Sequence, residues 1–207
     1  MKKSGITTIW FDFGNVLLPL QVEETYRAFK KLGAKKTLVR TNPIFYKWER
    51  GEIAPDEFID AIRTELKYAA SPGSIWQAWN AMLLPLPDEV IPFLRRLAKK
   101  YRLVLVSNIN HEHEQIIKKQ MGPFQYGQFL KCFNGIYYSH HAGKRKPEPA
   151  FFKQVLKEQK AKPAEVFFVD DTEENILAAE KLGINSWHFN PAADVIYDLD
   201  KVLLARH

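Results

Sequence analysis

The sequence has a single cysteine, Cys132, among 207 residues, which excludes an internal disulfide framework. It has no apolar run near the roughly 20 residues that a transmembrane helix needs. Its first residues, MKKSGITTIWFDFG, lack the apolar segment and the cleavage site of a signal peptide. Internal repeats and low-complexity segments are also absent. From these absences we expect a cytoplasmic protein with no membrane partner.

No long segment of the chain is rich in charges of one sign. The 30 lysines and arginines exceed the 24 acidic residues, which gives a formal net charge of +6. The basic groups KKLGAKK, RRLAKKYR and GKRK are short and typical of solvated helix faces. A modest positive field also attracts small phosphate anions. We therefore expect no nucleic-acid partner, and the sequence leaves the oligomeric state open.

Most of the chain alternates between strand and helix patterns. Short β-branched and aromatic runs predict buried strands at residues 7–11, 102–108, 135–141, 165–171 and 185–189. Amphipathic helices are expected at 88–100, 149–160 and 172–183, and Gly183 closes the last of them. This alternation indicates a parallel sheet with helices on both faces. We predict an α/β fold with a Rossmann-like, doubly wound parallel sheet of about five strands.

One block of the chain, residues 22–83, has helical periodicity without a strand signal. Its apolar stripes recur at three- and four-residue steps over Val22–Leu32, Phe58–Leu66 and Ile75–Leu83. We predict that residues 20–85 form a helical-bundle domain inserted into a core domain of residues 1–19 and 86–207.

Polar residues follow several of the predicted strands, where ligands bind in open parallel sheets. Clustered carboxylates repel each other and require a cation. Oxygen ligands suit Mg²⁺, which also binds phosphate oxygens. A carboxylate beside such an ion can attack phosphorus, while a lysine and a hydroxyl neutralise and hold the phosphate. The residues concerned are Asp12, Ser107, Asn108, Asp170 and Asp171, with Lys146 in the segment GKRKPEP.

The segments FDFGNVL, LVLVSN, GKRKPEP and VFFVDDTEENILAAEKLG resemble, in this order, the four signature motifs of the haloacid dehalogenase (HAD) superfamily. The helical insert after the first motif resembles the C1-type cap of that family. The resemblance implies a Mg²⁺-dependent hydrolase that attacks a small-molecule phosphate ester with a nucleophilic aspartate.

The resemblance also implies a role for each matching residue. Asp12 would be the nucleophile, and Lys146 would neutralise both it and the substrate phosphate. Ser107 and the backbone at Asn108 would hold the transferred phosphoryl group. The implied metal ligands are Asp12, the Gly14 carbonyl and Asp171, with Asp170 as a further ligand or supporting partner. Asn175 would orient Asp171 or cap its turn.

The first motif departs from the usual Asp-x-Asp pattern, because Gly14 occupies the position of the second aspartate. The carbonyl for the metal is kept, but the acid that protonates the leaving oxygen is lost, which typically costs roughly 10²–10⁴-fold in rate. A sugar 1-phosphate needs less protonation, because its anomeric oxygen is a better leaving group. The DFGNV variant also resembles a subgroup of HAD phosphatases (DxGN type) that includes sugar-1-phosphate enzymes. We predict a phosphatase for small phosphorylated metabolites, such as sugar phosphates, that forms an aspartyl-phosphate.

Two alternatives remain open at this stage. A metal-independent 2-haloacid dehalogenase needs no acid at Gly14, but the paired Asp170 and Asp171 argue against it. The second alternative is a weakly active binding or regulatory protein with the same fold.

Histidines add further possibilities near the predicted site. The alternation HEHE from His111 is typical of a capped, solvated helix start. The alternatives are proton donation by His111 or His113, or a metal site that these histidines form with Glu112 and Glu114. His140 and His141 precede the GKRK segment and are candidates for substrate contact. Trp76 and Trp79 are interpreted as core residues of the insert.

Overall fold

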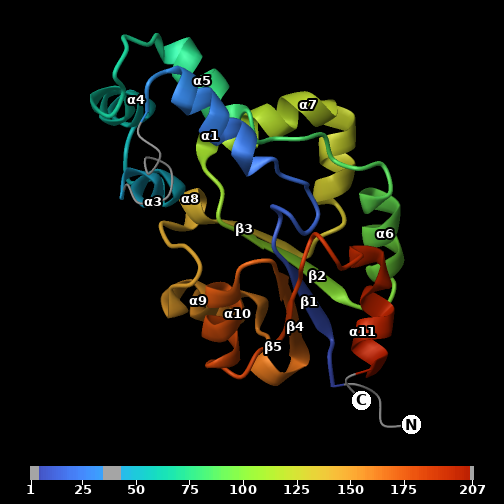
Figure 1. The fold of residues 1–207 in the computed structure, drawn as a ribbon. Coiled ribbons are helices and arrows are strands. Elements are labelled where there is room, and N and C mark those ends of the chain that lie inside the picture. The colour runs from blue at the N-terminus through green and yellow to red at the C-terminus, as the bar shows by residue number, and fades with distance from the viewer. Residues whose placement is uncertain (1–4, 35–42, 206–207) are drawn as a thin grey trace.

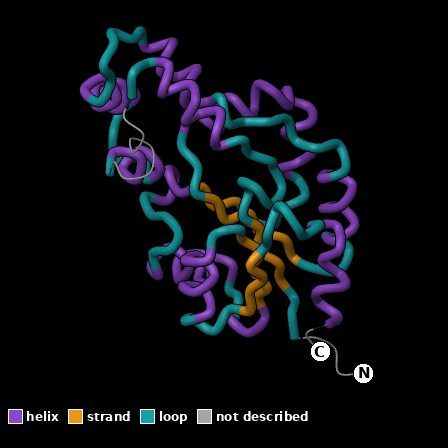
Figure 2. Tube along the Cα trace, viewed as in Figure 1, coloured by secondary structure: helices purple, strands orange, loops and turns teal. Residues whose placement is uncertain are grey.

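A five-stranded parallel sheet forms the centre of the computed structural model, which describes residues 5–34 and 43–205. Its order is β3-β2-β1-β4-β5, and each neighbouring pair is parallel. The strands lie together with helices around them (Figure 2). The predicted Rossmann-like fold is thereby confirmed. The strands are β1 (Thr8–Phe11), β2 (Arg102–Ser107), β3 (Gly135–Tyr138), β4 (Val166–Asp170) and β5 (Asn185–His188).

Helices cover both faces of this sheet (Figure 1). Successive strand residues face opposite sides, so Phe11 packs with one apolar cluster and Trp10 with the other. Residues of α6 (Val90–Leu97), α7 (His111–Leu130) and α11 (Leu199–Ala205) belong to the first cluster. Residues of α9 (Pro149–Gln159) and α10 (Glu173–Glu180) belong to the second. The sheet is therefore buried on both sides, as its continuous apolar strands predict.

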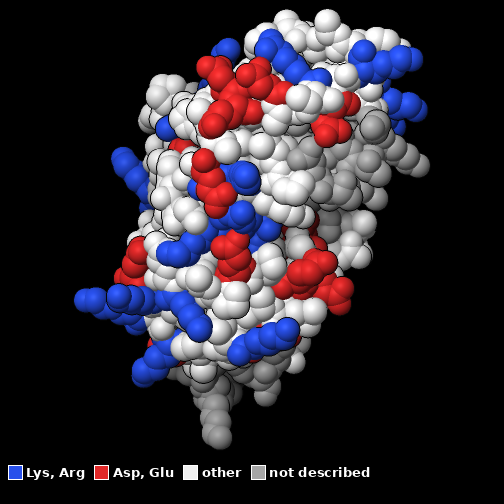
Figure 3. All heavy atoms as spheres, turned by 90° about the vertical axis from the view of Figure 1, so that its left-hand side faces the viewer, with Lys and Arg blue, Asp and Glu red and all other residues white. Residues whose placement is uncertain are grey.

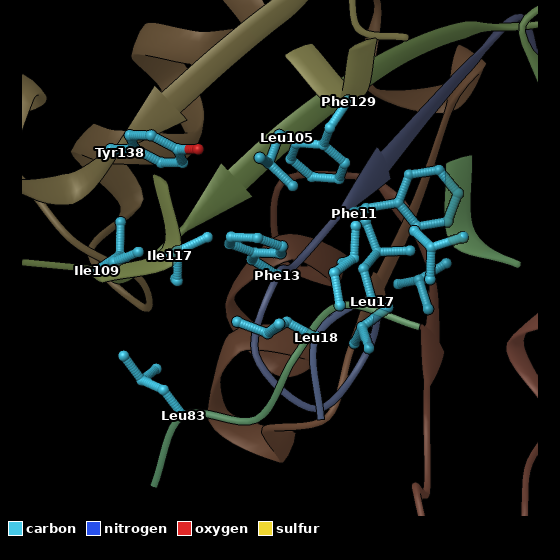
Figure 4. Packing of buried hydrophobic residues seen from close by; sticks show 14 of the residues in the cluster. Phe11, Phe13, Leu17, Leu18, Leu83, Leu105, Ile109, Ile117, Phe129 and Tyr138 are labelled. Atoms are coloured by element: carbon cyan, nitrogen blue, oxygen red, sulfur yellow. The ribbon is translucent and has the colours of Figure 1, made fainter. Parts of the chain in front are cut away.

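The loop that follows β1 is anchored by its own apolar side chains (Figure 4). Phe13 stacks on Phe129 of α7 with ring centroids 5.2 Å apart. Leu17 and Leu18 are also buried in this cluster. Because apolar burial contributes roughly 25 cal/mol per Å², these side chains hold the loop, and Asp12 at its start, in a fixed position.

The helices from α1 to α5 form a group apart from the sheet (Figure 1). They share an aromatic core in which Phe58 stacks on Trp48 and on Trp76, with centroids 5.0 and 5.3 Å apart. Trp79 belongs to the same core and stacks on Phe45. The prediction that these tryptophans pack inside the insert agrees with these contacts. The helices are α1 (Val22–Lys31), α3 (Ile44–Glu49), α4 (Pro55–Thr64) and α5 (Pro72–Asn80).

Several predicted elements are shorter in the structure. Helices α4 and α5 end before Leu66 and Leu83, and Leu83 instead forms an isolated β-bridge with Leu20. The strand predicted to 141 ends at Tyr138, and α8 (Ser139–Ala142) follows it. Here Ser139 Oγ donates to the Ile109 carbonyl and accepts from the Ile109 amide. These side-chain bonds replace the backbone pairing that would have continued the strand.

The remaining short helices are η1 (Pro163–Glu165) and η2 (Ile196–Asp198). Gly183 follows α10 with a φ of +81°, in agreement with its predicted role at the helix end. Within the described part of the chain, no helix combines the length and apolar character needed to span a membrane.

Candidate active site

Three carboxylates and one lysine meet where β1 and β4 end. Oxygen atoms of Asp12, Asp170 and Asp171 lie within 4.8 Å of one another. The ammonium of Lys146 lies 2.7 Å from Asp12 Oδ1 and 2.6 Å from Asp170 Oδ2. Lys146 is fully buried. The structure therefore brings together four residues that the sequence placed in three separate motifs.

Asn108 holds the backbone of Lys146 in place. Its amide nitrogen donates to the Lys146 carbonyl, and its amide oxygen accepts from the Lys146 N–H, each at 2.8 Å. The side chain of Asn108 is thus engaged by protein, which leaves its backbone for the predicted contact with a phosphoryl group. Ser107 precedes it as the last, buried residue of β2.

Asp170 is the most enclosed of the three carboxylates. Its Oδ2 accepts from Lys146, and its Oδ1 accepts from the Thr172 N–H at 2.8 Å and from the Asn175 amide at 2.9 Å. Of the two roles predicted for Asn175, the orientation of Asp171 is therefore wrong, because the Asn175 amide binds Asp170 instead. Asp171 is less buried than Asp170 and more open to a ligand.

Asn15 is a site residue that the sequence analysis missed. Its amide donates to Asp171 Oδ2 at 2.8 Å, and its Oδ1 accepts from the Leu20 N–H at 3.2 Å. Its φ is +57°, in the left-handed region that asparagine tolerates better than most residues. An asparagine directly after glycine in a post-strand turn was the available signal. Asn15 thus links the first motif to the fourth.

The electrostatics of the cluster favour a divalent cation. Burial raises the pKa of Asp12 to about 7; Lys146 opposes this shift, and Asp170 and Asp171 reinforce it. Burial opposes the charge of Lys146, but Asp12 and Asp170 outweigh it and raise the pKa of the ammonium. Three carboxylates against one ammonium leave an excess of negative charge in a largely buried place. Such a set of oxygen donors fits Mg²⁺.

The position of the missing acid is tightly packed. A Cβ atom added to Gly14 would lie 2.8 Å from Leu20 Cδ1, so a side chain there would require Leu20 to move.

His113 is not suited to replace the missing acid. It is buried, it stacks on Trp79 with centroids 4.8 Å apart, and burial lowers its pKa to about 4. His113 is therefore neutral near pH 7, which disfavours it as the proton donor.

Two ion pairs join the insert to the loop that carries Lys146. Arg145 Nε lies 2.7 Å from Glu49 Oε2, and Arg50 Nη1 lies 2.9 Å from Glu148 Oε1. The side of the molecule that includes α3, α8 and α9 shows basic and acidic side chains intermixed (Figure 3). The two pairs hold the end of α3 against residues that precede and follow Lys146 in the chain.

The fold and the site together define a parallel-sheet α/β protein with a carboxylate–lysine centre at the carboxyl edge of its sheet. The family model for haloacid dehalogenase-like hydrolases matches residues 6–183. The chain belongs to this family, and the family predicted from the four motifs is confirmed.

Two characterised relatives align over nearly the whole chain. The D-ribitol-5-phosphate phosphatase of Bacteroides thetaiotaomicron is 27% identical, over 96% of this chain and 98% of its own. The sesquiterpene phosphatase astK of Aspergillus oryzae is 26% identical, over 93% of this chain and 94% of its own.

Solved structures of other proteins are also similar to this chain. A HAD family enzyme from Bacteroides thetaiotaomicron, in complex with magnesium and inorganic phosphate, matches with a TM-score of 0.81 and 33% identity, covering 91% of this chain and 96% of that one. L-2-haloacid dehalogenase from Xanthobacter autotrophicus, at 19% identity and a TM-score of 0.58 over 87% of this chain and 76% of that one, shares the fold.

Proposed function

We propose that this protein is a Mg²⁺-dependent phosphatase that hydrolyses small phosphate monoesters through an aspartyl-phosphate on Asp12. The observation that carries the proposal is the buried ammonium of Lys146 between Asp12 and Asp170, with Asp171 beside them. The relatives named as phosphatases, and the similar enzyme crystallised with magnesium and phosphate, support the same chemistry.

The proposed metal ligands are Asp12, Asp171 and the backbone carbonyl of Gly14. Asp170 acts as their supporting partner, since both of its oxygens already accept hydrogen bonds from protein groups. When bound, Mg²⁺ would neutralise negative charge on the carboxylates and the substrate phosphate.

In the first step, a carboxylate oxygen of Asp12 attacks phosphorus, and the bond from phosphorus to the alcohol oxygen breaks. Lys146 offsets the charge on Asp12 and on the transferred group, which the Ser107 hydroxyl and the Asn108 backbone hold. With glycine at position 14, water protonates the leaving oxygen. In the second step, water attacks phosphorus, inorganic phosphate is released, and Asp12 is regenerated. Positioning and charge neutralisation supply most of the rate enhancement in such transfers.

We propose a sugar phosphate as the substrate, and within that class a sugar 1-phosphate. The reason is chemical: without an acid at Gly14, an anomeric leaving group needs the least protonation. The competing member of the class is a sugar-alcohol phosphate with a primary alkoxide leaving group, of the kind named for the Bacteroides thetaiotaomicron relative.

Phosphate release from matched pairs of 1-phosphates and primary-alcohol phosphates tests both levels of this proposal. We expect release that requires Mg²⁺, stops with chelator, and is fastest for 1-phosphates. Faster release from primary-alcohol phosphates would overturn the leaving-group argument alone. Absence of metal-dependent release from any ester would overturn the phosphatase, and halide release from 2-haloacids would then assign a dehalogenase.

We also propose that residues 20–85 act as a cap domain over a core of residues 1–19 and 86–207. The ion pairs of Glu49 and Arg50 with the Lys146 loop support this role, because they would hold the cap closed over the site. A closed cap keeps bulk water out during phosphoryl transfer and retains only the water molecules that the reaction uses.

The Glu49–Arg145 pair allows a direct test of the cap. Glu49→Gln removes the charge but keeps a hydrogen-bonding side chain, and a partly exposed pair contributes about 0.2–1 kcal/mol. We therefore expect kcat/KM to fall up to about fivefold with little change in melting temperature. Asp60→Asn is the matched control, because Asp60 pairs with Arg63 within α4 and takes no part in the contact with the Lys146 loop. Equal kinetics for the two variants would contradict a closing role for Glu49.

Asn15 allows a second test, of the link between the first and fourth motifs. Asn15→Ala should weaken Mg²⁺ activation, because Asp171 loses its amide donor, and should destabilise the fold by about 1–2 kcal/mol through the lost bond and the positive φ. Asn15→Gly also lacks the amide but accepts this φ without strain. We expect the glycine variant to recover the part of the stability that the positive φ costs, but neither the part due to the lost bond nor the Mg²⁺ affinity, as measured by urea unfolding and by Mg²⁺ titration of activity. Recovery of both would mean that the amide is dispensable.

A further inference from the structure

A second cluster of metal-ligating side chains lies at the start of α7 and in α8. One ligand atom each from His111, Glu114 and His140 lies within 4.8 Å of the others. His141 adds an imidazole whose Nε2 is 3.4 Å from Glu114 Oε2. None of these side chains takes part in the proposed phosphoryl transfer.

The hydrogen bonds of His140 determine which of its nitrogens is available. Nδ1 lies 2.8 Å from the carbonyl oxygen of Ile109, which can only accept, so Nδ1 carries the proton. In a neutral ring Nε2 then has a lone pair, and it faces Glu114 Oε2 at 3.1 Å. Two acceptors at this distance require a cation shared between them, either a proton on the ring or a metal ion.

The contacts of Glu114 occupy its Oε1 and leave its Oε2 to bind a metal ion. Its Oε1 accepts from the Tyr126 hydroxyl at 3.2 Å and lies 3.5 Å from Lys118 Nζ, while Oε2 faces the imidazoles. The side chains of Glu114 and His140 are 8% and 5% exposed. His111 is exposed, which leaves a route for an ion. Hydrogen bonds of this kind, to a ligating histidine and carboxylate, orient ligands in metal sites.

We propose that His111, Glu114 and His140 form a second metal site, which takes a divalent transition ion such as Zn²⁺, with His141 or water as the fourth ligand. Ligands about 2.0–2.1 Å from a tetrahedral ion are roughly 3.3–3.4 Å apart. The observed separations of 3.1 and 3.4 Å from Glu114 Oε2 are close to this. A donor set rich in imidazole selects Zn²⁺ over Mg²⁺, which prefers oxygen.

An ion here would connect parts of the protein that surround the active site. Helix α7 follows the strand that ends at Ser107, and α8 precedes the loop of Lys146. The insert also touches this place, since a Cβ added to Gly51 would lie 2.6 Å from the His140 carbonyl oxygen. The site is therefore positioned to stabilise the junction of insert and core, independently of the proposed phosphatase activity.

The test is Zn²⁺ binding to tag-free, chelator-treated full-length protein in excess Mg²⁺, measured by equilibrium dialysis and elemental analysis. We expect one Zn²⁺ per chain, a raised melting temperature, and visible absorption typical of a four-coordinate site when Co²⁺ replaces Zn²⁺. His111→Asn and Glu114→Gln should each weaken binding at least tenfold. Glu112→Gln, on the same helix turn but bonded to Asn80, is the matched control and should bind as the wild type does.

Asp171→Asn separates this site from the carboxylate cluster. Zn²⁺ binding that survives Asp171→Asn and is lost in His111→Asn supports the proposal. Absence of Zn²⁺ binding in the wild type, or equal binding in the wild type and His111→Asn, would overturn it and leave Glu114 and His140 as an ion pair formed by a protonated ring.

Discussion

Asp12→Asn is expected to lower kcat by about 10⁴-fold or more, because the amide has the shape of the carboxylate but cannot attack phosphorus. The variant should remain folded, since Lys146 keeps its 2.6 Å contact with Asp170. Substrate binding should change much less than kcat, because the loss concerns a bond formed only during reaction.

Steady-state phosphate release with saturating Mg²⁺ measures this effect. Asp12→Ala should behave in the same way, which guards against deamidation of the asparagine. Asp60→Asn, an exposed aspartate of α4 that pairs with Arg63, is the surface control and should retain wild-type kcat. An Asp12→Asn enzyme within tenfold of the wild type would rule out Asp12 as the nucleophile.

Lys146→Met should impair both stability and activity. The fully buried ammonium contacts two carboxylates, and removing one partner of a buried ion pair costs about 3–5 kcal/mol, because the remaining charge is left uncompensated. We expect a loss of this size in the free energy of unfolding without metal. Because Mg²⁺ offsets the same carboxylate charge, it should stabilise the variant more than the wild type.

Urea unfolding with and without Mg²⁺ measures both effects, and phosphate release measures the loss of activity. Lys144→Met is the matched control, since Lys144 lies two residues earlier and bonds only to the Gln154 side chain among the described contacts. If Lys146→Met were as stable and as active as Lys144→Met, the buried ammonium would have no part in the site.

The core fold could be predicted because its signals are local. Apolar runs of strand length alternate with amphipathic helices, and the parallel sheet follows from that order. The meeting of Asp12 and Asp170 was also predictable, since carboxyl ends of parallel strands share one edge. Lys146 follows no strand, and only the resemblance of its segment to a family motif placed it there. Helix ends were harder to predict, because the apolar spacing continues to Leu66 and Leu83, beyond the last residues of α4 and α5.

Contacts between distant segments could not be read from the sequence. Asn15 reaches Asp171 across 156 positions, and Glu49 reaches Arg145 across 96. No local sequence pattern identifies the partner of Asn15 or of Glu49. Asn175 shows the same limit at short range: its place in the motif was clear, but which of two adjacent aspartates it binds depends on side-chain geometry.

The most direct test of the account is acid quenching of the first turnover with the best substrate, followed by mass spectrometry of the peptide that contains Asp12. We predict a single phosphoryl group on Asp12, sensitive to hydroxylamine as an acyl phosphate is, formed only with Mg²⁺ and absent in Asp12→Asn. Phosphate release at the wild-type rate by Asp12→Asn, or a first turnover that leaves the phosphoryl group on another residue, would contradict the account.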